Sequence, residues 1–131
     1  MVQIFITQFD YDRLMKLLKK RRPHDEYDKA LLAELERGKI IGPEAVPPDV
    51  ITMNSQVRFR DEYGENWELW LVFPEDAELS KGRISILSPI GCALIGYKKG
   101  DAIVVPTPKG RRELSVEAII HQPEREGNYD L

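Results

Sequence analysis

Three acidic side chains and one histidine in the stretch KKRRPHDEYD form the densest group of possible metal ligands in this 131-residue chain. They are His24, Asp25, Glu26 and Asp28. Asp25 and Asp28 stand three residues apart, so on a helix both carboxylates would lie on one side and could face one cation. Acidic residues in a first helical turn are also favoured by the helix dipole and by capping. We therefore predict the start of a helix here and no metal site.

Four consecutive basic residues, Lys19, Lys20, Arg21 and Arg22, precede these acids. Cations are favoured at the C-terminus of a helix, so a solvated face is the default interpretation. The alternative is an electrostatic contact with an acidic protein surface or with nucleic acid, which would be strongly salt dependent. Because the net charge of the chain is −3, any contact with nucleic acid would have to depend on this local patch.

The rest of the chain carries no recognised catalytic motif. The patterns HExxH, GxGxxG and GxSxG and the Walker-type phosphate loop are all absent. Cys92 is the only cysteine, which excludes an internal disulfide, and we predict a small buried hydrophobe rather than a nucleophile. Trp67 and Trp70 differ in parity, so on a strand they point to opposite faces of the sheet. We predict that they pack in the core, with at most one exposed, and we predict no catalytic residue and no cofactor.

Two amphipathic helices are predicted in the first third of the chain. Apolar residues recur at helical spacing after Thr7, and the pattern repeats after Pro23 until Gly38. The helices should span about residues 7–21 and 24–37 and form a short antiparallel hairpin, with arms of about 22 Å at 1.5 Å per residue. The charged stretch described above is its tip. Residues 39–50 are rich in Gly and Pro and are predicted to link the hairpin to a second unit.

The remaining sequence changes to a period of two, which indicates strands. A β-hairpin is predicted around residues 57–73, a short strand at 83–87, and two further strands near 102–106 and 111–120. The segment SPIGCALIG is predicted to form a short helix, with Ser88 as its N-cap and Gly96 at its end. The fold class is therefore α+β, with a helical hairpin at residues 1–46 and a small antiparallel sheet with one packed helix at residues 47–131.

Composition supports a folded chain of this size. Hydrophobic residues make up 42% and charged residues 31%, and 131 residues suit one domain or one small core with an appendage. No apolar run approaches the ~20 residues needed to cross a bilayer, and no secretion signal is visible. We predict a cytoplasmic monomer with no membrane contact.

The segment ISILSPIGCALIGYKKGD, residues 84–101, resembles the C-terminal domain of the bacterial Gre transcript-cleavage factors. The stretches VITMNSQVRFR, PIGCALIG and QPEREGNYDL resemble the Rnk group, regulators of nucleoside diphosphate kinase in the same GreA/GreB superfamily. The resemblance implies an FKBP-like C-terminal domain joined to a coiled-coil hairpin. It also implies binding to bacterial RNA polymerase near its secondary channel, with DNA contacted only indirectly through the transcription complex.

The same resemblance assigns roles to particular residues. The Gre-type Ser-Pro turn, associated with polymerase docking, matches Ser88 and Pro89, flanked here by Leu87 and Gly91. In Gre factors two acids at the tip of a long hairpin help to hold a catalytic magnesium. That tip motif is absent here and the arms are about half as long, too short to position a metal at the active centre. The Gre acids are therefore not assigned to Asp25 or Asp28.

Three functions remain open from the sequence. The first is a regulator without enzyme activity that docks on the rim of the secondary channel and competes with Gre factors without stimulating cleavage. The second is a cleavage-stimulating factor that uses Asp25, Glu26 or Asp28. The third, from fold resemblance alone, is an FKBP-like peptidyl-prolyl isomerase. An effect on nucleoside diphosphate kinase could be direct or could act through transcription.

Overall fold

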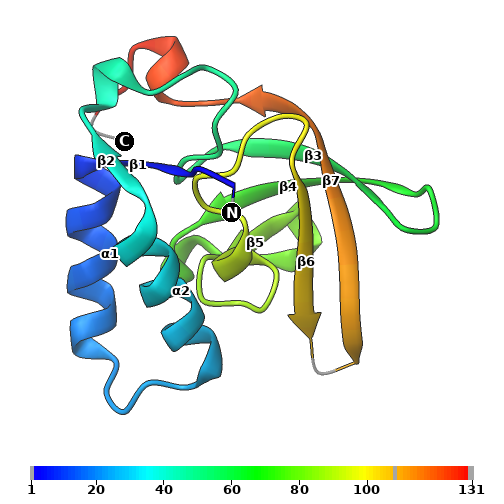
Figure 1. Cartoon of the computed structure of the whole chain (residues 1–131), viewed down its shortest axis with the longest axis horizontal. Coiled ribbons are helices and arrows are strands. Elements are labelled where there is room, and N and C mark those ends of the chain that lie inside the picture. The colour runs from blue at the N-terminus through cyan, green and yellow to red at the C-terminus, as the bar shows by residue number, and fades with distance from the viewer. Residues whose placement is uncertain (1, 108, 130–131) are drawn as a thin grey trace.

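The chain begins with two helices framed by two short strands, as Figure 1 shows. The structure is a computed structural model and describes residues 2–107 and 109–129. Strand β1 (Phe5–Thr7) leads directly into helix α1 (Gln8–Lys20), and helix α2 (Glu26–Arg37) leads into strand β2 (Lys39–Ile41). β1 and β2 pair in parallel and hold the base of the hairpin closed. Both helices were predicted from the sequence, whereas neither strand was.

Side-chain caps explain where the helices begin. Thr7 accepts a hydrogen bond from the backbone N–H of Asp10 at the start of α1. At the start of α2, Asp25 accepts from the N–H of Asp28, while Asp28 accepts from the N–H of Asp25. This reciprocal pair is a capping box, which satisfies two N–H groups that would otherwise lack partners. The acids of the hairpin tip therefore have the helix-starting role that their spacing predicted.

The larger sheet has five strands in the order β5-β4-β3-β7-β6. β3, β4, β7 and β6 pair antiparallel, but β5 runs parallel to β4, so the predicted antiparallel sheet is in fact mixed. A parallel neighbour needs a crossover connection. The segment between β4 and β5 supplies it through two short 3-10 helices, η2 (Pro74–Asp76) and η3 (Leu79–Lys81). The strand bounds are Gln56–Asp61 (β3), Asn66–Val72 (β4), Arg83–Ser85 (β5), Ala102–Thr107 (β6) and Gly110–His121 (β7).

The prediction of a helix in SPIGCALIG is wrong. The structure has only a single 3-10 turn there, η4 (Gly91–Ala93), within a series of tight turns. The Ser88 hydroxyl accepts a hydrogen bond from the Gly91 N–H at 3.0 Å and donates one to the Ser85 carbonyl at 2.7 Å. A Cβ on Gly91 would lie 2.0 Å from that carbonyl oxygen. The chain folds back on Ser85 too closely for a regular helix to form.

The helices and the large sheet share one hydrophobic core. Leu14, Leu18, Leu31 and Leu35 are fully buried in the same cluster as Phe59 of β3. In Figure 1 the helical pair accordingly lies against one side of the sheet and the turns around η4. The α+β class is confirmed, whereas a coiled coil, an FKBP-like domain and a division at residue 46 stay predictions. None of the helices within the described residues is long and apolar enough to span a bilayer.

A buried carboxylate also ties α1 to the segment before β3. One Asp10 oxygen accepts from the Met53 N–H at 3.0 Å, and the other forms an ion pair with Arg13 at 2.6 Å. Burial raises the pKa of Asp10, although these hydrogen bonds and the Arg13 charge oppose the shift. A second buried acid, Glu124, accepts from the Thr52 hydroxyl at 2.7 Å, and burial raises its pKa as well. The Asp10 contact fixes the hairpin on the core, and the Glu124 contact fixes the C-terminal turn on the same segment before β3.

The prediction that the two tryptophans pack in the core is wrong, whereas the prediction that at most one of them is exposed is confirmed. Trp67 is 41% exposed, and its indole N–H donates to Asp61 at 3.0 Å. Burial acts to raise the pKa of Asp61, but this hydrogen bond, two backbone N–H groups and the Arg112 cation lower it overall. Trp70 is half-buried on the opposite face of the sheet. Cys92 is buried as predicted, and burial raises the pKa of its thiol to about 11.

Candidate docking groove and hairpin tip

An apolar groove of about 480 Å³ lies beside the Ser-Pro turn. Ser88 and Pro89 contribute to its wall together with Ile84 of β5. The other apolar lining residues are Ala77, Leu79 and Ile90. Leu79 is 81% exposed, the highest fraction among the exposed large hydrophobic side chains of the described residues. Exposed apolar patches on a small folded chain are frequently interaction sites. Two charged side chains, Glu78 and Arg83, also line the groove.

The turn is held rigidly by its own hydrogen bonds. Besides the two bonds of the Ser88 hydroxyl, the Leu87 N–H donates to the Ser85 hydroxyl at 3.0 Å. Leu87 is half-buried and packs against the core, and Gly91 is buried beneath the turn, so neither lines the groove. Of the four residues predicted for docking, the structure therefore places Ser88 and Pro89 at the groove. Leu87 and Gly91 support the turn from beneath.

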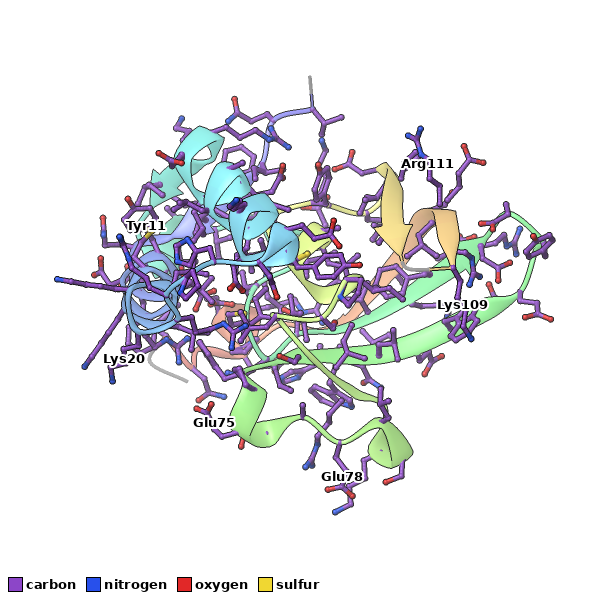
Figure 2. All side chains as sticks on the ribbon, turned by 90° about the horizontal axis from the view of Figure 1, so that it is seen from below. Tyr11, Lys20, Glu75, Glu78, Lys109 and Arg111 are labelled. Atoms are coloured by element: carbon purple, nitrogen blue, oxygen red, sulfur yellow. The ribbon has the colours of Figure 1, made fainter. Side chains whose placement is uncertain are left out.

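Sequence reasoning missed the other side of this groove. Leu79 and Ile84 reach it because the crossover through η2 and η3 returns the chain alongside β4. The one visible signal was the isolated leucine in the polar segment PEDAELSKG. In Figure 2, Glu75 and Glu78 mark these two turns at an edge of the molecule that is remote from α2.

The carboxylates of the hairpin tip are occupied by local contacts. Asp28 is buried, and its second oxygen accepts from the Arg21 guanidinium at 3.2 Å. The same guanidinium lies 3.9 Å from Asp25. His24 donates from Nε2 to the carbonyl of Leu18 at 2.8 Å and so helps to end α1. Within residues 2–107 and 109–129, no three potential ligands are grouped to hold a metal ion.

Two of the basic residues of the tip, Lys19 and Arg22, border a second hollow, of about 400 Å³, on the helical pair. Its apolar part is formed by Met15, Leu18 and Leu32. Lys20 is exposed on the outer side of α1, far from Lys109 and Arg111 at the β6–β7 hairpin (Figure 2). The basic patch of the tip therefore does not extend to the β6–β7 hairpin. The basic and polar residues that line the hollow are Lys16, Lys19, Arg22 and His24.

Two known protein families match this chain in sequence. A family model described as "Transcription elongation factor, GreA/GreB, C-term" matches residues 46–121, more than half of the chain. The chain belongs to the GreA/GreB family. A second family model, "Rnk N-terminus", matches residues 3–41, which contain both helices and the β1–β2 pair. The resemblance to the Rnk and Gre proteins is thus confirmed over nearly the whole chain.

Individual GreA/GreB relatives show the same relationship. The "Regulator of nucleoside diphosphate kinase" of Escherichia coli K12 is 41% identical over 104 residues, covering 78% of this chain and 76% of the relative. "Transcription elongation factor GreA" of Azorhizobium caulinodans is 38% identical over 90 residues, covering 65% of this chain and 57% of the relative. A solved structure, "Prokaryotic transcription elongation factor GreA/GreB from Nitrosomonas europaea", superposes with a TM-score of 0.78 at 39% identity. That match covers 92% of this chain and 100% of the other.

Proposed function

We propose that this chain is a cytoplasmic, monomeric regulator of the Rnk type that binds bacterial RNA polymerase at the rim of the secondary channel. It competes there with Gre factors and does not stimulate transcript cleavage. The observation that carries the proposal is the apolar groove beside Ser88 and Pro89 in a chain of the GreA/GreB family. Contact with DNA is indirect, through the transcription complex.

The groove has the composition of a docking surface. Leu79, Pro89 and Ile90 offer apolar area, and the central part of a protein interface is depleted of charge. Glu78 and Arg83 supply opposite charges beside it, which orient a partner more than they add affinity. Because internal hydrogen bonds fix the Ser-Pro turn, docking costs little ordering of the backbone.

The hairpin favours occupancy of the channel over catalysis. α1 and α2 have 13 and 12 residues, which corresponds to lengths of about 20 Å. Asp25 and Asp28 serve as caps and partners of Arg21, so a metal ion would have to displace these contacts. The exposed lysines and Arg22 would instead face the acidic surfaces of a metal-binding channel.

Competition for purified RNA polymerase tests the proposal directly. A labelled Gre factor is bound to the polymerase, and the unlabelled chain is added at increasing concentration. We expect displacement that weakens as salt is raised, because the basic tip contributes to binding. Failure of the chain to bind polymerase or to displace the Gre factor contradicts the proposal.

An assay of transcript cleavage by stalled polymerase complexes distinguishes this proposal from the leading alternative, a cleavage-stimulating factor. The proposal expects no added cleavage with the wild-type chain or with Asp25→Asn, Glu26→Gln and Asp28→Asn variants. Cleavage that depends on the chain and disappears in any of these variants would establish a Gre-like factor with a shortened hairpin. A proline-peptide isomerase assay addresses the FKBP-like alternative, and we expect no activity.

A further inference from the structure

A separate pocket of about 330 Å³ lies on the large sheet and is not part of the docking groove, although Arg83 borders both. Six residues line it: Asn54, Trp70, Val72, Asp76, Arg83 and His121. Small-molecule sites in proteins typically combine an apolar or aromatic wall with a few convergent polar groups, in volumes from about 300 Å³. This pocket meets both conditions at the small end of the range.

The register of the sheet brings the main groups together. Arg83 of β5 pairs with Trp70 of β4, Trp70 pairs with Gln56 of β3, and Gln56 pairs with His121 of β7. Directly paired residues on neighbouring strands present their side chains on the same face. The four residues thus form one row across the sheet. The rings of Trp70 and His121 meet with centroids 5.5 Å apart, at an angle of 50°.

Two charged side chains at the pocket have no internal counter-ion. Within the described residues, neither the Arg83 guanidinium nor the Asp76 carboxylate forms a side-chain hydrogen bond or ion pair. Other arginines on this face are paired, Arg58 with Glu68 at 3.0 Å and Arg60 with Glu117 at 3.1 Å. Arg83 and Asp76 are therefore available to a ligand.

We propose that this pocket binds a nucleoside monophosphate whose base carries N–H donors on its edge, as guanine does. The Trp70 indole offers a flat aromatic surface for stacking on the base. The Arg83 guanidinium suits a phosphate, to which it can donate two parallel hydrogen bonds. The Asp76 carboxylate accepts hydrogen bonds from the N–H edge of the base.

Fluorescence of Trp70 provides the test, and it needs no polymerase. In a Trp67→Phe background Trp70 is the only tryptophan, because the chain contains two. We expect guanosine monophosphate to quench this fluorescence saturably, and inorganic phosphate and guanosine, each added alone, to bind much more weakly. Arg83→Gln should weaken binding by about tenfold, the loss of one charge-assisted contact. Arg111→Gln removes another exposed arginine, at the β6–β7 hairpin, and should leave binding unchanged.

Three outcomes would overturn the inference. The first is no saturable response to guanosine monophosphate when calorimetry on the wild-type chain also detects no binding. The second is equal binding by the Arg83→Gln and wild-type chains. The third is binding of single-stranded oligonucleotides with no binding of the mononucleotide, which would indicate a nucleic-acid surface instead of a small-molecule site.

Discussion

Replacing Leu79 by serine should weaken polymerase binding without affecting the fold. Leu79 is 81% exposed on η3, so its removal leaves the core of the free chain intact. Surface substitutions of this kind usually change the free energy of unfolding by less than about 0.5 kcal/mol. Ser88 is a less suitable target, because its hydroxyl holds the turn together through two hydrogen bonds.

The size of the effect follows from how much of Leu79 a partner can cover. Full burial of an exposed leucine side chain contributes about 1.5–3 kcal/mol. At about 1.4 kcal/mol per factor of ten, its loss corresponds to a Kd roughly 10- to 150-fold higher. Partial burial in the complex would place the result near the lower limit.

The assay is the equilibrium binding of labelled chain to purified polymerase, with circular dichroism and urea unfolding as controls for folding. Val104→Ser is the matched control, because Val104 is 44% exposed on β6 and does not line the groove. We expect it to bind like wild type. Equal affinities for Leu79→Ser and wild type, with both chains folded, would refute the groove as the docking surface.

Three further predictions concern stability, measured by urea unfolding. Gly91→Ala should cost about 1–3 kcal/mol because the new Cβ would lie 2.0 Å from the Ser85 carbonyl oxygen, whereas Gly42→Ala, with its nearest atom at 3.4 Å, should be nearly neutral. Because burial raises the pKa of Glu124 above its usual 4.5, the folded chain holds this proton more strongly than the unfolded chain. The resulting stability is present below pH 4.5 and is lost as the pH rises through the folded-state pKa. Glu124→Gln removes the titrating group and should make the free energy of unfolding less dependent on pH in this range. An unchanged pH profile in the variant would contradict this role of Glu124. Asp28→Asn should cost about 1 kcal/mol by weakening the capping box, and an unaltered unfolding midpoint would contradict that role.

The helical hairpin could be predicted because its signals are local. The apolar spacing, the cap at Thr7, the acids that start α2 and the stop at Gly38 all act within a few residues of their positions. The β3–β4 hairpin was predictable for the same reason, from its alternating pattern. These elements would have similar preferences in almost any surrounding structure.

The errors arose where contacts beyond a single helical turn or strand pair decide the conformation. SPIGCALIG has the composition of a helix, but the contact of Gly91 with the Ser85 carbonyl and the burial of its apolar side chains against α2 favour turns. The parallel pairing of β5 depends on how the crossover returns to β4, and no local pattern records that choice. Trp67 is exposed because Asp61, with Arg112 beside it, binds its indole at the sheet end.

Contacts of this kind also explain why the docking groove could be predicted in part from the sequence and the pocket on the large sheet could not. Half of the docking groove is the Ser-Pro turn, whose residues are adjacent in sequence and could be named in advance. The other half, and the whole Arg83–Trp70–His121 pocket, exists only because strands far apart in the chain adopt one register. A shift of one residue between β4 and β5 would move Arg83 to the opposite face and abolish the row. The register of this edge strand is therefore the structural feature on which both proposed binding sites depend.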